Sequence, residues 1–310
     1  MTLDVRGGTL RTTLAGHNRR VSSVALTPDG RLGLTGSLDK TARFWDLQAG
    51  VCLKVLEGHA REVNGVALSA DGRTALCATG EMMSDESLTR AWDLRTGSAM
   101  YDLGGHTGEV STVAHHAGRG LVATGGVDAT VRLWELNLGR RQTVFEGHAG
   151  WVRTAAFVPN GDQVLTGGMD GTLRVWDIAT ARTAHVLEAH RGGVHAVAAS
   201  PDGRRALSAG RDTQLRLWDL ASGQCLRTFD GHTESVRTVA WSRDGRWALS
   251  GGQDKTLRLW DVDSGRAAWT GTLTGWALSV ALSGDSRTAL VGTYDRKVLV
   301  YDLDFAPAAP

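Results

Sequence analysis

Residues 249–261 read LSGGQDKTLRLWD, and nearly the same thirteen letters stand at two earlier places in the chain. Residues 165–177 read LTGGMDGTLRVWD, and residues 207–219 read LSAGRDTQLRLWD. Self-similarity at a constant period is the signature of a repeat architecture, in which each copy is one small structural unit. The fold is therefore to be inferred from the period and the content of this repeat.

The aromatic residue near the end of each copy gives the period. It recurs with spacings of 47, 42, 42, 42, 42 and 41 residues, at Trp45, Trp92, Trp134, Trp176, Trp218, Trp260 and Tyr301. A Gly-His or Ala-His pair precedes it by 28 residues in most copies, although the second copy needs 33 residues and the seventh has Leu273 in place of the His. Seven copies thus cover residues 8–303 of the 310-residue chain.

Each copy contains short stretches in which apolar and polar residues alternate. In the sixth copy they are residues 236–241, 246–250 and 256–260, and a fourth stretch lies at 267–271. Alternation with period two predicts half-buried β-strands, and the Asp-Gly pairs between the stretches are typical of tight turns. No segment shows the periodicity of an amphipathic helix.

This period, with four short strands and a Gly-His…Trp-Asp bracket, resembles the WD40 repeat over nearly the whole chain. The resemblance implies an all-β fold, a seven-bladed β-propeller of four-stranded antiparallel blades in one domain of residues 1–310. In that family the N-terminal strand closes the last blade, so residues 9–14 are expected to pair with residues 297–302. Residues 304–310 are expected to form a short Pro/Ala tail and no strand.

The resemblance also implies a hydrogen-bonded tetrad inside a blade, made of the His, a Ser or Thr, an Asp and the Trp. Five copies can form it, with His17, Thr35, Asp39 and Trp45; His106, Thr124, Asp128 and Trp134; His148, Thr166, Asp170 and Trp176; His190, Ser208, Asp212 and Trp218; and His232, Ser250, Asp254 and Trp260. Buried polar groups need partners, which such a network supplies. Ser-His-Asp also suggests a hydrolase, but one active site would not need five copies.

Two copies depart from the tetrad. The second has Cys77 at the Ser/Thr position, and whether Asp85 or Glu86 of its insertion takes the acid position stays open. The seventh has Leu273, Val291 and Tyr301, so apolar packing is expected there. We expect no catalytic residues, no cofactor and no metal site, because the usual catalytic motifs are missing and the adjacent His115 and His116 would point to opposite faces of a strand.

In WD40 proteins partners dock around the central channel, and three positions of each repeat tend to point there. The position just before the first Val holds Arg20, Glu62, Glu109, Trp151, Gly193, Ser235 and Trp276; the position just after it holds Ser22, Asn64, Ser111, Arg153, His195, Arg237 and Leu278. From these two positions and the residue before the tetrad Asp, we select eight candidate partner-binding residues in copies four to seven. They are Trp151, Arg153, Met169, His195, Arg211, Arg237, Trp276 and Tyr294. Interfaces are enriched in Trp, Tyr and Arg, although single exposed aromatics are also ordinary surface features.

Composition limits the remaining possibilities. The formal net charge is +1, which argues against a dedicated nucleic-acid or anionic-membrane binder. Three Cys residues without a CxxC pair, and no signal peptide or long apolar run, favour the cytoplasm. Only four of the 34 basic residues are Lys, a bias that resembles a GC-rich bacterial genome.

Three functions compete on these grounds. We favour a non-catalytic, monomeric scaffold that binds a protein or peptide on the narrow face of the propeller. The alternatives are a nucleic-acid binder that uses the arginine-rich rim, and an enzyme with its site in the central channel. Steep loss of binding with added salt would indicate the second, and converging carboxylates on the inner strands would indicate the third.

Overall fold

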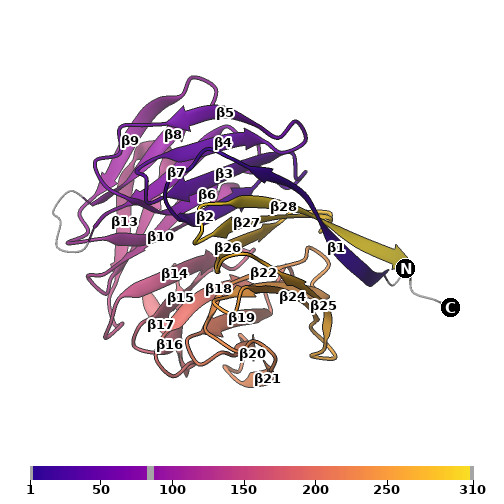
Figure 1. Cartoon of the computed structure of the whole chain (residues 1–310). Coiled ribbons are helices and arrows are strands. Elements are labelled where there is room, and N and C mark those ends of the chain that lie inside the picture. The colour runs from indigo at the N-terminus through magenta and orange to yellow at the C-terminus, as the bar shows by residue number, and fades with distance from the viewer. Residues whose placement is uncertain (1–2, 82–86, 308–310) are drawn as a thin grey trace.

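The computed structural model describes residues 3–81 and 87–307 and contains seven four-stranded antiparallel sheets. The sheets are arranged around a central axis as the blades of a propeller (Figure 1). This confirms the predicted all-β, seven-bladed fold. Within blades one to six the chain runs from the innermost strand outward, so neighbouring strands in the sequence are also neighbours in the sheet.

The first three blades follow one another along the chain. Blade one contains β2 (Val21–Leu26), β3 (Leu32–Ser37), β4 (Ala42–Asp46) and β5 (Val51–Leu56). Blade two contains β6 (Val63–Leu68), β7 (Thr74–Thr79), β8 (Leu88–Asp93) and β9 (Ser98–Gly104). Blade three contains β10 (Val110–His116), β11 (Leu121–Gly126), β12 (Val131–Glu135) and β13 (Arg140–Phe145), with the short 3₁₀ turns η1 (Ala117–Arg119) and η2 (Leu136–Leu138) between strands.

The next three blades repeat the pattern. Blade four contains β14 (Val152–Phe157), β15 (Gln163–Gly168), β16 (Thr172–Asp177) and β17 (Arg182–Glu188). Blade five contains β18 (Val194–Ala199), β19 (Arg205–Gly210), β20 (Leu215–Asp219) and β21 (Cys225–Phe229). Blade six contains β22 (Val236–Trp241), β23 (Trp247–Gly252), β24 (Thr256–Asp261) and β25 (Ala267–Thr272).

Blade seven joins the two ends of the chain. Its strands β26 (Ala277–Leu282), β27 (Thr288–Thr293) and β28 (Val298–Pro307) are completed by the N-terminal strand β1 (Leu3–Leu14), which pairs antiparallel with β28. The closure by the N-terminal strand is therefore confirmed. The predicted tail was wrong for residues 304–307, because β28 continues through Phe305 to Pro307, opposite Leu3, and residues 308–310 lie outside the described residues. The ladder between β27 and β28 ends at Asp302, so the missing N–H of Pro307 does not interrupt it.

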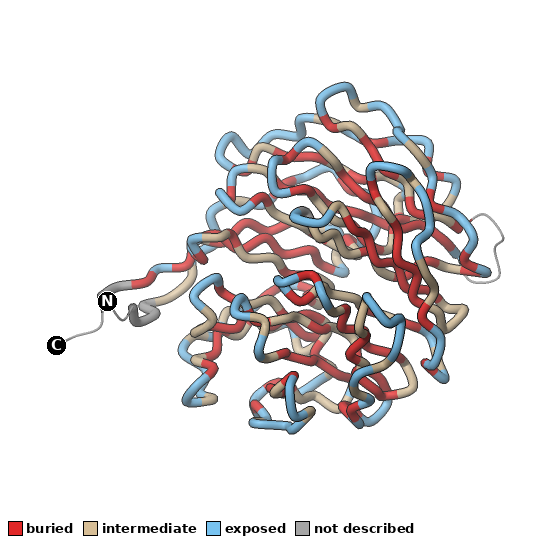
Figure 2. Tube along the Cα trace, turned by 180° about the vertical axis from the view of Figure 1, so that it is seen from behind, coloured by how far each residue is buried: buried red, intermediate tan, exposed pale blue. Residues whose placement is uncertain are grey.

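The hydrophobic core lies between the blades. One cluster combines Leu133 and Phe145 of blade three with Val152 and Trp176 of blade four, and similar clusters join other neighbouring blades. Glycines in the second strand allow close approach: a Cβ on Gly167 would lie 2.4 Å from Cγ1 of Val194 in the next blade. Each sheet thus buries both faces only when it has neighbours, and buried segments fill the interior while the turns are exposed (Figure 2).

Every innermost strand carries an irregularity at the same place. The register against the second strand shifts between Val21 and Ser23 in blade one and between Val152 and Thr154 in blade four. The other five blades shift at the equivalent position. A bulge of this kind redirects the unpaired side chain, so one residue per blade is set apart from the regular ladder.

Within the described part of the chain, no helix is long and apolar enough to cross a membrane.

Candidate binding site at the central channel

Blade six shows the tetrad in full. Trp260 Nε1 donates to Ser250 Oγ at 2.8 Å, and His232 lies 2.7 Å from the same oxygen through Nε2. Its Nδ1 lies 2.8 Å from Asp254 Oδ2. The same three contacts are present in four other blades, in the sets that contain Trp45, Trp134, Trp176 and Trp218.

A fifth residue belongs to this network, and sequence reasoning missed it. In blade six Thr256 donates its hydroxyl to Asp254 at 2.9 Å and its backbone N–H at 3.0 Å. Thr41, Thr130 and Thr172 occupy the equivalent place, whereas in blade five Arg216 Nη1 contacts Asp212 at 2.8 Å. Burial would raise the pKa of Asp254, but the charge of His232 and these hydrogen bonds hold it below the usual value. The recurring Asp-x-Thr pattern was the available signal.

The network consists of buried side chains that bond to one another, which is a structural use of Ser, His and Asp. The side chain of His232 is 1% exposed and that of Asp254 is 4% exposed. The glycine before the tetrad His leaves room for a neighbouring side chain. In blade four a Cβ on Gly147, with φ 149°, would lie 2.8 Å from the guanidinium of Arg174. The tetrads are thus enclosed, and the side chains available to a partner lie elsewhere.

Blades two and seven lack the network. In blade two both ring nitrogens of His59 and Nε1 of Trp92 are buried without a partner among the described residues, and Cys77 is buried beside them. Asp85 and Glu86 lie outside the described residues. In blade seven Leu273, Val291 and Tyr301 are buried in one cluster, as the sequence predicts.

The seven bulge residues surround the axis of the propeller. They line a cavity of about 720 Å³ together with neighbouring residues of the innermost strands. We call them the channel ring, and they are Ser22, Asn64, Ser111, Arg153, His195, Arg237 and Leu278. The register shift thus explains why the position after the first Val points into the channel in every repeat.

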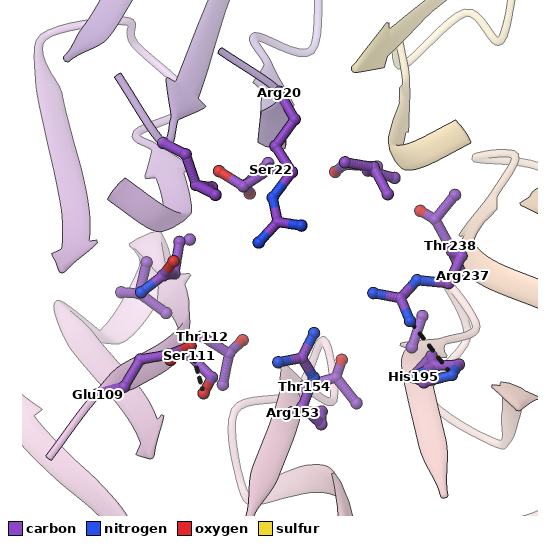
Figure 3. Close-up of a pocket in the computed structure, with 18 of the residues that line it drawn as sticks. Arg20, Ser22, Glu109, Ser111, Thr112, Arg153, Thr154, His195, Arg237 and Thr238 are labelled. Carbon is purple, nitrogen blue, oxygen red and sulfur yellow. Dashed lines mark hydrogen bonds between the residues drawn. The ribbon is translucent and has the colours of Figure 1, made fainter. Parts of the chain in front are cut away.

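Charge is distributed unevenly around the channel. Arg153, His195 and Arg237 come from three consecutive blades, and Arg237 Nη1 lies 3.4 Å from His195 Nε2. In Figure 3 the guanidinium groups of Arg153, Arg237 and Arg20 point toward the open centre. The acids Glu62, Glu81 and Glu109 line the sector that blades two and three contribute.

Burial and like charge perturb these groups. The pKa of Arg237 is lowered to about 10, first by burial and then by the charges of Arg153 and Arg20. The pKa of His195 is lowered to about 3 by burial, Arg237 and Arg153, so its ring is neutral at pH 7. On the opposite side burial raises the pKa of Glu109, against the lowering effect of Arg153.

The eight candidate binding residues fall into three groups. Arg153, His195 and Arg237 line the channel. The rings of Trp276 and Tyr294 stack in blade seven with centroids 4.8 Å apart. The other three, Trp151, Met169 and Arg211, lie at the turns around the channel mouth. Trp151 is 41% exposed, and its carbonyl accepts a hydrogen bond from the backbone N–H of Met169. The backbone N–H of Arg211 donates in the same way to the carbonyl of Gly193.

Sequence reasoning left Arg20 out of the selected set. Its guanidinium carbon lies 5.7 Å from the ring centroid of Tyr294, because closure of the ring places blade one next to blade seven. It holds the position before the first Val, so its place near the mouth was predicted. Its membership in the patch was missed because the choice was limited to copies four to seven.

His115 and His116 do not form a metal centre with other ligands. His116 Nε2 lies 2.9 Å from the carbonyl oxygen of Pro159, and His115 is half-buried one residue earlier in the strand. Among the residues that the structure describes, no group of three or more His, Cys, Asp or Glu side chains is arranged to hold a metal ion.

The same repeat is matched in known proteins. The model of the WD40 family, described as "WD domain, G-beta repeat", matches residues 8–46, 50–93, 97–135, 139–177, 181–219 and 223–261. Each matched unit starts in or just before the outermost strand of one blade and ends in the third strand of the next. Blade seven, without a tetrad, lies outside these matches apart from part of β1.

A short local match connects the chain with a named protein. It is 54% identical over 35 residues to the small ribosomal subunit protein RACK1 of Caenorhabditis elegans. The match covers 11% of this chain and 11% of that protein. The bacterial source inferred from composition gains no support from these matches. Six matched repeats and seven closed four-stranded blades establish that this chain belongs to the WD40 repeat family.

Proposed function

We propose that this chain is a non-catalytic interaction scaffold that holds a protein or peptide partner at the channel mouth. Propellers of this family are typically scaffolds for protein interactions and generally non-catalytic. The observation that carries the proposal is the contrast between constant and variable positions. Five blades repeat the same buried tetrad, whereas the channel ring holds Ser, Asn, Arg, His and Leu at one equivalent position. A fixed frame with one varied surface is how a repeat protein gains specificity.

The chemistry of this surface favours a partner with acidic and apolar groups. Arg153 and Arg237 line the channel from blades four and six, and the tilted pair Trp276 and Tyr294 lies in blade seven next to Arg20 of blade one. Aromatic residues and Arg dominate the binding energy of interfaces. We further propose that the protein acts as a monomer in the cytoplasm, which its three free Cys residues support.

The test combines two substitutions at the mouth. Arg153→Ala and Trp276→Ala remove one channel cation and one rim aromatic, so we expect each to weaken partner binding by ~1–3 kcal/mol. Partners captured from the source cells by the wild-type chain are compared with those captured by each variant, and affinities are then measured with the isolated partner. Both variants should keep the melting temperature within a few degrees.

Matched substitutions on the other face serve as controls. Arg31 lies in an exposed turn after the innermost strand of blade one, and Leu138 in η2 is 66% exposed. Arg31→Ala and Leu138→Ala should leave the captured partner unchanged. Equal affinity in wild type and both mouth variants would reject the surface proposed here. A captured nucleic acid whose binding falls steeply with salt would favour that alternative instead.

A further inference from the structure

Three guanidinium groups lie around the channel without a direct ion pair to a carboxylate, and Glu109 is the acid that acts on Arg153 through its charge (Figure 3). Arg20, Arg153 and Arg237 come from blades one, four and six and point toward the same open space. Over residues 3–81 and 87–307 none of the three makes an ion pair with an Asp or Glu. Arg20 is exposed at the mouth, whereas Arg153 and Arg237 are partly buried, where cations are normally paired.

The acids that line the channel form no direct ion pair with these three arginines in the described chain. Glu62 lies 3.6 Å from Arg19, and Glu81 lies 3.3 Å from Arg61, so both carboxylates have a cation at the periphery. Glu109 is the third acid of the lining, and it accepts a hydrogen bond from the hydroxyl of Ser111 at 3.4 Å. The arginine side of the channel therefore keeps an excess of positive charge.

Arg153 and Arg237 are costly to keep charged in this place. Burial lowers the pKa of Arg153, against the raising effect of Glu109, and the charge of Arg20 lowers it further. Burial followed by the charges of Arg153 and Arg20 lowers the pKa of Arg237, so these neighbouring cations destabilise its charged form. An anion between them would reverse the sign of this interaction.

His195 is the neighbour of Arg237 in the channel lining. Its Nε2 accepts a hydrogen bond from Arg237, so the proton of the neutral ring is on Nδ1, which is enclosed by protein. A neutral imidazole accepts from Arg237 without balancing its charge, so the guanidinium keeps its capacity to bind an anion.

We propose that the mouth of the central channel is a binding site for an oxyanion, a carboxylate or a phosphate, held between the guanidinium groups of Arg153 and Arg237 with Arg20 closing the site from blade one. Guanidinium groups bind both anions through paired N–H donors, which an ammonium group does not match. The cavity of about 720 Å³ admits a side chain of a partner carrying such a group.

The role of the site rests on the proposed function, because the oxyanion is the part of the partner that would enter the channel. The site itself does not need the partner to be detected. Binding of small anions to the isolated chain and capture of a partner are separate measurements. They can therefore fail independently.

The experiment titrates the full chain with inorganic pyrophosphate and, separately, with citrate, by calorimetry at constant ionic strength and pH 7.5. We expect saturable binding at one site for at least one of the two anions. Arg153→Gln and Arg237→Gln should each weaken it by about tenfold, as expected for a lost charge-assisted hydrogen bond. Arg153→Lys should restore the binding only in part, because Lys lacks the planar pair of donors.

Glu109 gives a prediction of opposite sign. Its carboxylate opposes an anion beside Arg153, so Glu109→Gln should tighten anion binding by several-fold. A merely structural role of these residues predicts no such increase. Arg31→Gln, which removes the same charge from the other face, should leave the affinity unchanged. Melting temperatures check the fold, and removal of one repelling arginine should not lower them.

The outcomes separate cleanly. Binding of pyrophosphate alone assigns a phosphate ligand, binding of citrate alone assigns a carboxylate ligand, and both support the site. Absence of saturable binding at about 10 mM of either anion, or an equal effect of Arg31→Gln and Arg153→Gln, overturns it. If the chain binds the anion but its partner binds the mouth variants as tightly as the wild type, the proposed function is rejected and the anion site is retained.

Discussion

Blades two and six are built on the same ladder but differ in their interiors. Cys77 faces Arg90 across the strands of blade two as Ser250 faces Arg258 in blade six. In blade six the Ser hydroxyl joins Trp260 to His232, whereas in blade two the corresponding indole and imidazole nitrogens have no partner in the described residues. The His and Trp rings are also closer in blade two, with centroids 5.3 Å apart against 6.1 Å.

The comparison shows that the tetrad does not create the blade. Strand pairing and apolar packing between blades are sufficient for the sheet, because β6 to β9 form a complete four-stranded ladder without the network. What the tetrad adds is satisfaction of buried polar groups, which has its own free energy. Three substitutions test this separation.

The largest effect is expected from Asp254→Ala in blade six. The carboxylate accepts from His232 Nδ1, from the backbone N–H groups of Thr233 and Thr256, and from the Thr256 hydroxyl. Its loss leaves several buried donors unpaired and should lower the free energy of unfolding by about 3 kcal/mol, measured by urea denaturation. Asp263→Ala, at a carboxylate that is 78% exposed, is the control and should cost at most about 1 kcal/mol. A loss for Asp254→Ala no larger than that of the control would contradict a stabilising role of the network.

A second test uses the pH dependence of blade two. The pKa of His59 is lowered to about 4, first by burial and then by the charge of Arg90, against the raising effect of Asp102. In the unfolded chain it titrates near 6.5, so that state binds the proton more tightly. The His59 contribution is therefore constant above about pH 6.5 and is lost as the pH falls toward 4.

His59→Phe removes this proton uptake while keeping a flat ring against Trp92. Between pH 7.5 and pH 5 the wild-type chain should lose about 2 kcal/mol more unfolding free energy than the variant. The measurement is urea denaturation at a series of pH values. Parallel pH profiles of the two chains would show that His59 is not the buried neutral base described above.

The smallest effect is expected from Cys77→Ser, which gives blade two the hydroxyl that blade six has. The oxygen would accept from Trp92 Nε1 and pair with His59, so we expect a gain of about 1 kcal/mol. The reverse exchange, Ser250→Cys, should cost about 1–2 kcal/mol in the same denaturation assay. If Cys77→Ser destabilised the chain, the shorter ring separation in blade two would leave no room for the bridge.

Much of this molecule could be predicted because the repeat ties residue type to position. A period near 42 residues, with fixed offsets from the His to the Trp, carries the resemblance to the WD40 family, and that resemblance implied the positions of the tetrad residues and of the channel ring. It also implied closure of the last blade by the N-terminal strand. These features depend on local order within one repeat, which a single sequence displays.

Features that depend on contacts between distant repeats could not be predicted as well. The strand β28 runs on to Pro307 because β1 extends to Leu3 and pairs with it, a fact invisible in a Pro-rich segment taken alone. Arg20 joins the channel arginines only because blade one adjoins blade seven. The charge excess likewise depends on which acids are already paired, as Glu62 is with Arg19.

The pairing of Leu3 with Pro307 has a consequence for biosynthesis. Strand β1 is synthesised long before it can pair, since its partner β28 follows all the other strands of the ring in the chain. At ordinary translation rates it waits roughly 15–60 s with an open edge. Throughout this interval the nascent ring is a crescent with two unsatisfied ends, so protection of those ends by chaperones should matter more for this chain than for a protein whose domains close as they emerge.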